Sequence, residues 1–334
     1  MKKFQFNYVI LLLIVTALAI FPFVMESRTW TILLTQVFIF GILAMSYDIL
    51  LGYTGIVSFG HAMFFGMGAY TTAVMLDRME PTIGLFVLSI IAGMAIAGVI
   101  SFAVGLLTLR LKSHFFAMLT MALSGLFLVL AEKWRSLTFG NDGFTFKAPE
   151  VFRDRIVFYL VALGLLVVIY LFLRRFVNSP LGKILVAVRE NEPRTRALGY
   201  NTLHYKVIAS VVAGVVASLA GSLYAVSLRF VNTSVLTMDI TLDALLMTII
   251  GGVGTLIGPL LGAGIIELAQ HYLSDLASTH PIFERWIIFF GIIYILAVIF
   301  FPMGIVGFFR NLKMKRKKRV EASVISSKSK EAAS

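Results

Sequence analysis

Four carboxylates lie within or beside long apolar stretches of the sequence: Asp48, Asp239, Asp243 and Glu267. A charged side chain is costly in hydrocarbon and usually faces a cavity or a polar partner. Asp48 stands in SYDILLGYTG, next to a glycine-rich segment, so we expect it to face a solute pathway, with a structural role as the alternative. For Asp243 and Glu267, a structural position near a membrane interface is favoured.

Motifs for catalysis are missing from the sequence. It contains no Gly-x-x-x-x-Gly-Lys-Ser/Thr loop, no His-Glu-x-x-His and no Gly-x-Ser-x-Gly. His61 and His114 have no metal-binding partner at helical spacing, and the chain has no cysteine for a disulfide or a thiolate site. We therefore expect no catalytic residue, no metal and no cofactor on this chain.

Two glycine-rich segments interrupt the apolar pattern, LGYTGIVSFGHAMFFGMGAY (51–70) and GGVGTLIGPLLGAG (251–264). Broken helices expose backbone polar groups to solutes in transporters, and tight helix packing is the alternative. Gly254, Gly258 and Gly262 recur every four residues, which predicts one closely packed helix face. With Asp48, the expected pathway residues are Tyr53, Thr54, Ser58, Gly60, His61, Gly68, Tyr70, Gly251, Gly254 and Thr255.

The charged loop 178–206 lies between two apolar blocks, and its sequence predicts two short helices. Ser179 can cap the first helix and Pro180 suits its first turn. Pro193 is expected to interrupt that helix, and Gly199 to end the second. A structured, charged hairpin of this kind is a candidate docking surface, although a loop folded only for its own sake remains the alternative.

Composition indicates an all-α polytopic membrane protein, because 59% of the residues are hydrophobic and only 14% are charged. About ten transmembrane segments with glycine-broken helices are expected. The first segment is read as a retained span, with a cleaved signal as the alternative. The expected spans are Tyr8–Val24, Trp30–Leu51, Ile56–Leu76, Ile83–Leu109, His114–Ala131, Ile156–Leu173, Val207–Leu228, Leu242–Leu273 in two pieces, and Trp286–Phe309.

The distribution of basic residues predicts the orientation. If the count of crossings is even, 20 of the 29 Lys and Arg residues fall in cytoplasmic segments. Both termini and the loop 178–206 then face the cytoplasm. Residues 1–310 form one membrane domain, and 311–334 form a basic disordered tail whose expected contact is anionic lipid.

The segments quoted above, with FGNDG (139–143), RENEPRTRALGYN (189–201) and GGVGTLIGPLLGA (251–263), resemble LivM-type inner-membrane permeases of ABC importers for branched-chain amino acids. The resemblance implies a homologous LivH-type permease partner, two ATP-binding cassette ATPases that hydrolyse the ATP, and an extracytoplasmic substrate-binding protein. Asp48 stands where relatives usually carry Asn, and Pro193 in a stretch that is commonly rich in Ala. The resemblance implies ATPase contact by Arg189, Glu190, Asn191, Glu192, Arg194, Leu198 and Gly199.

The resulting hypothesis is a permease subunit that translocates branched-chain amino acids across the inner (plasma) membrane without ATPase activity of its own. A permease of the same family for urea or short amides is one alternative. An ion-coupled secondary transporter that uses Asp48 and Glu267 is another, from a different class. A membrane enzyme is disfavoured, because the catalytic motifs are missing.

Overall fold

The computed structural model describes residues 2–25, 27–109, 113–279, 288, 291–292, 295, 299 and 304–307. Most of the expected last span and the whole tail 311–334 lie outside the described residues, so both stay predictions. The helices are α1 (Lys2–Val24), α2 (Arg28–Asp48), α3 (His61–Arg78), α4 (Ile83–Thr108), α5 (Ser113–Lys133), α6 (Arg135–Thr138), α7 (Arg155–Asn178), α8 (Pro180–Ala197), α9 (Thr202–Leu228), α10 (Met238–Gly251) and α11 (Ile257–Thr279).

Long apolar helices form most of the described chain. Among the described residues, five helical stretches are long and apolar enough to cross a membrane: 28–54, 83–108, 114–133, 155–178 and 202–228. They are buried unequally. In an apolar 18-residue stretch of each, the buried share is 83% in the first but only 28% in α4 and 22% in α5. The chain is therefore an all-α, multi-pass membrane protein in which α2 lies at the centre and α4 and α5 lie at the periphery.

Small residues allow α3 and α9 to pack backbone against backbone. A Cβ added to Gly68 of α3 would collide with the carbonyl oxygen of Ser218, and one added to Gly221 of α9 would collide with the carbonyl oxygen of Phe65. Close approach through small residues is a common way for membrane helices to associate. Gly68, in the first glycine-rich segment, therefore serves helix packing.

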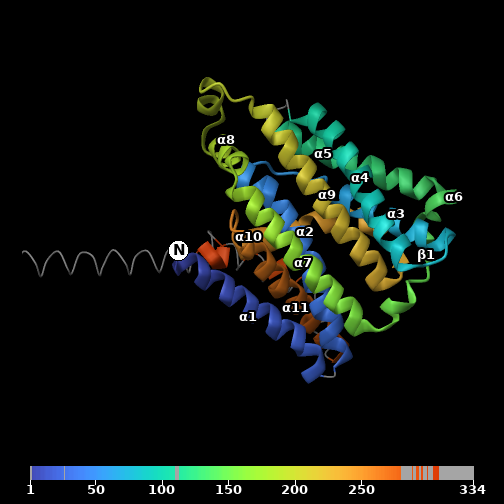
Figure 1. Cartoon of the computed structure of the whole chain (residues 1–334). Helices are drawn as coiled ribbons and strands as arrows, with labels where there is room; N and C mark the ends of the chain where they lie inside the picture. The colour runs from blue at the N-terminus through green and yellow to red at the C-terminus, as the bar shows by residue number, and fades with distance from the viewer. Residues whose placement is uncertain are drawn as a thin grey trace, which may run out of the picture.

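The two ends of the bundle carry different elements (Figure 1). α8 lies at one end, next to the C-terminus of α7 and the start of α9. At the other end, β1 (Phe144–Thr145) pairs antiparallel with β2 (Phe230–Val231), in the register Phe144↔Val231. Three short 3-10 helices join these strands to the bundle: η2 (Gly140–Asp142), η3 (Glu150–Arg153) and η4 (Thr233–Leu236).

The third span begins later than the sequence predicts, at His61 rather than Ile56. α2 continues into the π-helical segment η1 (Ile49–Thr54), which ends at Gly55 with φ of 72°. Residues 55–60 are not helical. Side chains satisfy part of this backbone instead: the Tyr47 hydroxyl donates to the Ser58 carbonyl at 3.0 Å, and the Phe59 N–H donates to Thr120 Oγ1 at 3.2 Å.

Between α10 and α11 the chain leaves the helical conformation at 252–256. Gly252, Gly254 and Leu256 have φ of 126°, 75° and 56°. The expected helix face of three glycines is wrong for Gly254, because its backbone is left-handed and not helical. Within α11, a Cβ on Gly258 would lie 2.6 Å from the Gly252 carbonyl oxygen, and one on Gly262 would collide with the Met247 carbonyl oxygen. These two glycines pack α11 tightly against α10.

α8 consists of two helical pieces, but the break differs from the prediction. It lies at Asn191, whose φ of −161° and ψ of 93° are not helical, and not at Pro193. Asn191 Oδ1 accepts a hydrogen bond from the Arg194 N–H at 3.0 Å and so caps the second piece. Pro193 is tolerated in the first turn of that piece, where its missing N–H has no helical partner. The predicted Ser179 cap and the left-handed Gly199, with φ of 92°, are confirmed.

Candidate functional site

Asp48, the strongest pathway candidate in the sequence, lies at the end of α2 and is completely buried. Its Oδ1 accepts a hydrogen bond from the Gly254 N–H at 2.7 Å, and its Oδ2 accepts one from the Leu256 N–H at 3.2 Å. Backbone donors are strong partners for a carboxylate. In this structure the Asp48 side chain therefore fixes the conformation of the loop 252–256.

Gly52 brings the η1 backbone against the same loop. A Cβ at Gly52 would lie 2.5 Å from the Gly254 nitrogen and would collide with the Asp48 carboxylate. From α8, the Arg189 guanidinium donates a hydrogen bond to the Gly52 carbonyl oxygen. Thr255 accepts from the Gly258 N–H at 3.0 Å and donates to the Gly252 carbonyl at 2.7 Å, so it caps the start of α11. We call residues 48–55, 189 and 252–256 the junction.

A second group of the predicted residues surrounds the non-helical segment 55–60. His61 is fully buried, and its Nε2 lies 3.1 Å from Ser46 Oγ. Ser58 Oγ accepts from the Gly60 N–H at 3.3 Å, and a Cβ on Gly60 would lie 2.9 Å from the Thr120 carbonyl oxygen. These groups stabilise the start of α3, and their role in a solute path stays a prediction.

The remaining residues of the first segment lie apart from that group. Thr54 Oγ1 donates to the Leu50 carbonyl within η1 at 2.6 Å, and Tyr53 beside it is half-buried. Gly68 packs against Ser218 of α9. The buried hydroxyl of Tyr70 has no hydrogen-bond partner among the described residues. The structure thus distributes the predicted pathway residues over the junction, the start of α3 and the contact between α3 and α9.

Of the three remaining carboxylates, Asp243 and Glu267 lie close to each other on α10 and α11, whereas Asp239 is exposed in the first turn of α10. Glu267 is buried with 6% of its surface exposed, and it interacts electrostatically with the half-buried Asp243 and with Tyr224 of α9. The sequence favours a structural position near an interface for both carboxylates. Glu267 is almost completely enclosed by protein, and its position near a membrane interface stays a prediction.

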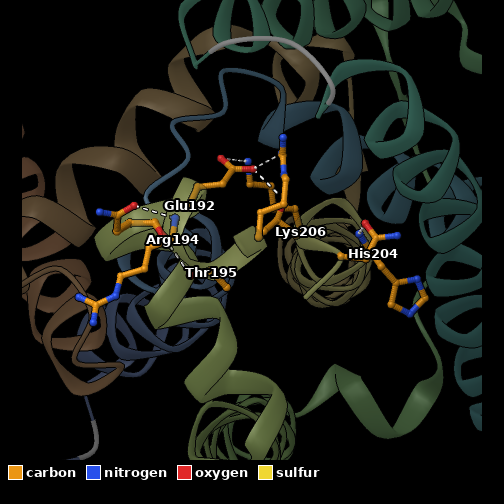
Figure 2. A network of polar contacts seen from close by, with 9 residues as sticks. Glu192, Arg194, Thr195, His204 and Lys206 are labelled. Atoms are coloured by element: carbon orange, nitrogen blue, oxygen red, sulfur yellow. Dashed lines mark hydrogen bonds and ion pairs between the residues drawn. The ribbon is translucent and has the colours of Figure 1, made fainter. Parts of the chain in front are cut away.

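The second piece of α8 is attached to α9 through Glu192 (Figure 2). Its carboxylate accepts from Lys206 Nζ at 2.6 Å, from Thr202 Oγ1 at 2.9 Å and from Arg196 Nη2 at 3.1 Å. Partial burial alone raises the pKa of Glu192, but the hydrogen bonds from Lys206 and Thr202 and the nearby positive charges outweigh it, so that the pKa lies below its ordinary value. Glu192 is thus a brace within the chain.

Other residues predicted for docking point outward. Leu198 has 70% of its surface exposed, and Arg194, Asn191 and Gly199 are exposed as well. Glu190 Oε1 forms an ion pair with Arg189 Nη2 at 2.7 Å, which orients the guanidinium toward the junction. The outward face of α8 therefore combines an exposed leucine with a cationic side chain.

Cavities lie at both ends of the bundle. Near α8, a cavity of about 450 Å³ is lined by Thr54, Gly55, Phe116, Arg189, Asn191, Glu192 and Lys206, among others. At the opposite end, two adjoining cavities of about 500 and 390 Å³ share Thr31, Arg153 and Arg155. Arg28 lines the first of these and Arg229 the second.

These arginines were not found from the sequence. They come from four different segments, and each alone resembles an ordinary charge at the end of a membrane helix. Arg153 and Arg155 are close together in the sequence, but Arg28 and Arg229 lie far from them, and no spacing rule connects these three places. Their common position becomes visible only when α2, α7 and α9 are packed together.

Buried polar breaks within an all-helical membrane bundle, together with a structured charged hairpin at one end, are features of a transport protein's membrane subunit. A family model described as "branched-chain amino acid transport system / permease component" matches residues 30–298. The chain therefore belongs to this family of permease components.

Individual relatives cover most of the chain. It is 27% identical over 332 residues to the high-affinity branched-chain amino acid transport system permease protein LivM of Escherichia coli K12, covering 91% of this chain and 76% of the relative. The LivM protein of Salmonella typhimurium gives the same values. A probable branched-chain amino acid transport permease protein LivM of Methanocaldococcus jannaschii is 22% identical, covering 79% of this chain and 89% of the relative. No solved structure matches the chain.

Proposed function

We propose that the chain is the membrane-spanning subunit of an ATP-driven importer that carries leucine, isoleucine or valine across the inner membrane. The observation that carries the proposal is the similarity to LivM permeases over 91% of the chain. The substrate is taken from the names of these relatives. ATP is hydrolysed on two partner ATPases, solute arrives from an extracytoplasmic binding protein, and a homologous permease completes the path.

The outward face of α8 is the proposed docking surface for an ATPase. Exposed Leu198 supplies an apolar anchor, and Arg194 supplies a cation beside it. Leu198 and the charged side chains around it form the exposed end of the second piece of α8, where a partner protein can reach them. Glu192 supports this surface from behind, because it links the second piece of α8 to Lys206 of α9.

The proposed topology has ten crossings, with both termini on the side of α8. Two contacts support it. Tyr159 of α7 donates to the Leu18 carbonyl at 2.7 Å, which aligns α1 with α7. A Cβ on Gly304 would lie 2.5 Å from the Gly252 nitrogen, so the described part of the last segment lies against the junction at the α8 end.

Uptake and reconstitution test the proposed function. In the native host, loss of this subunit should abolish ATP-dependent uptake of labelled leucine, and the plasmid-borne gene should restore it. In proteoliposomes, uptake should require this chain, the second permease, the ATPases and the binding protein together. Loss of urea uptake with leucine uptake unchanged would contradict the substrate. Gradient-driven uptake by this chain alone would contradict the class of transporter.

A further inference from the structure

Arg189 is the side chain by which α8 reaches the membrane part of the molecule at the junction. Its guanidinium donates to the carbonyl oxygen of Gly52 in η1. A Cβ on Gly254 would lie only 3.3 Å from Arg189 Nη1 and 3.2 Å from the Gly52 oxygen. The arginine head group thus lies against both η1 and the loop between α10 and α11.

The aliphatic part of the arginine is fixed as well. A Cβ at Gly55, where φ is 72°, would lie 2.8 Å from Arg189 Cγ. The Arg189 side chain therefore packs directly on the backbone of Gly55, and only glycine fits there without strain. On the outer side, Glu190 pairs with the guanidinium at 2.7 Å, so the Arg189 side chain lies between η1, the loop 252–256 and Glu190.

Asp48 secures the other side of the junction. It binds two N–H groups of the loop 252–256, and Arg189 interacts electrostatically with the carboxylate. The loop also contacts the last described segment, since a Cβ on Gly252 would lie 3.4 Å from Val306 Cβ. Backbone contacts as close as these do not compress, so a displacement on one side must be followed on the other.

We propose that Arg189 is a positioning residue that transmits movement of the docking helix α8 to the loop 252–256, with Asp48 holding that loop to the end of α2. The inference rests on the proposed function, because it takes an ATPase as the source of the movement. It also assigns Asp48 a role different from the substrate contact expected from the sequence. The buried carboxylate is a backbone clamp in the transmission path.

Arg189→Gln in the full complex, reconstituted in proteoliposomes, tests this transmission. Glutamine keeps a donor but loses the charge and the reach to the Gly52 carbonyl. We expect the ATPases to remain bound, while leucine transported per ATP hydrolysed falls at least tenfold. Arg189→Lys, which keeps the cation, should recover part of that ratio. Lys183→Gln, which removes an exposed cation on the same helix, is the matched control and should leave the ratio unchanged.

A second measurement follows the loop directly. Val253 has 40% of its surface exposed, and the chain contains no cysteine, so Val253→Cys provides a single labelling site. In the otherwise unchanged protein, ATP binding should alter the thiol labelling rate at least threefold. In the Arg189→Gln background that ATP response should disappear. A residue with a purely structural role would change stability without removing this response selectively.

Each remaining outcome decides against the inference. If Arg189→Gln keeps both the transport ratio and the labelling response, no movement passes through Arg189. If it releases the ATPases, Arg189 acts in docking. If it does not accumulate, Asp48→Ala, which removes both acceptor oxygens, breaks the same junction from the membrane side, and normal coupling in that variant refutes the proposal. If the unchanged chain itself fails to assemble with ATPases, the proposed function is wrong, which is a distinct result.

Discussion

At the α8 end of the bundle, segments far apart in the sequence meet beside one cavity of about 450 Å³ through backbone contacts that leave no room for a Cβ, whereas at the opposite end the helices part around two adjoining cavities edged by arginines. The first arrangement suits the transfer of movement, because closely packed backbone segments cannot move independently of one another. The second arrangement suits contact with dissolved molecules, because the positive charge of the arginines around a cavity attracts anionic groups. The same membrane helices, α2, α7 and α9, run between both ends.

Left-handed backbone occurs at both ends, and glycine is needed where it coincides with a close contact. At the junction, Gly52, Gly55 and Gly254 allow the contact with α8, and two of them have left-handed backbone. Residues other than glycine also adopt positive φ at both ends: Leu256 in the junction, and Phe139 and Arg229 at the opposite end. Such positions cost free energy, and the Arg229 side chain compensates by donating to the Phe152 carbonyl at 2.9 Å.

Labelling from outside the cell would show whether the two ends lie on opposite sides of the membrane, and its expected effect is all or none. Val151→Cys lies at the arginine-rich end and is 47% exposed. Ala197→Cys lies on the exposed face of α8. We expect an impermeant thiol reagent to label Val151→Cys in intact cells and Ala197→Cys only after permeabilisation. The reverse pattern would invert the topology.

Tight packing between α3 and α9 should be the feature most sensitive to added volume. A side chain at Gly68 meets the Ser218 carbonyl oxygen, a backbone atom that cannot move aside. We expect Gly68→Val to reduce the free energy of unfolding by about 3 kcal/mol or to prevent folding. Gly164→Val is the matched control, since no atom lies within 4 Å of its Cβ position. Thermal unfolding in detergent measures both, and equal melting temperatures would refute the close contact.

Local rules predicted much of the fold. Hydropathy located the five long apolar helices, and capping rules placed Ser179 at the start of α8 and Gly199 beyond its end. The break in α8 was expected at Pro193, because proline usually ends a helix, but the Asn191 cap moved it two residues earlier. Such competition between a cap and a proline depends on which group finds a partner in the folded chain.

Long-range contacts could not be predicted in the same way. The sequence identified Asp48 as a carboxylate within the membrane and favoured a solute pathway for it, but it did not identify its backbone partners, because Gly254 lies 206 residues away. Intramembrane carboxylates serve pathways and structural clamps alike, and only the geometry of their donors separates the two uses. The clustered arginines of the opposite end remained hidden for the same reason.

Docking at the α8 end should depend on Leu198, whereas the stability of the isolated chain should not. The side chain is 70% exposed, so Leu198→Ala removes no core contact. If Leu198 is an anchor for an ATPase, we expect the affinity for the ATPases to fall about tenfold, or about 1.4 kcal/mol. Val151→Ala at the opposite end is the control and should not change it. Binding to the purified ATPases measures the effect, and equal affinities of both variants would exclude this anchor.

The smallest expected effect concerns the brace behind the docking surface. Because the pKa of Glu192 is lower in the folded chain than its ordinary value of 4.5, its carboxylate stabilises the fold above that value and loses this contribution as the pH falls through the folded pKa. Glu192→Gln cannot form the ion pair and leaves Lys206, which is only 12% exposed, without it. The variant should therefore be less stable than the unchanged chain at pH 7, by up to about 1 kcal/mol.

Acid should abolish that difference, because protonated Glu192 and glutamine are both neutral. Thermal unfolding measured from pH 7 to pH 3 should show two curves that are separate at neutral pH and converge below the folded pKa of Glu192. Glu150→Gln provides the contrast from the opposite end. Glu150 is 89% exposed and forms a long ion pair of 3.8 Å with Arg153, so removing its charge should leave the unfolding curve unchanged at every pH. A constant separation at every pH would mean that Glu192 supports α8 through its shape and hydrogen bonds and not through its charge.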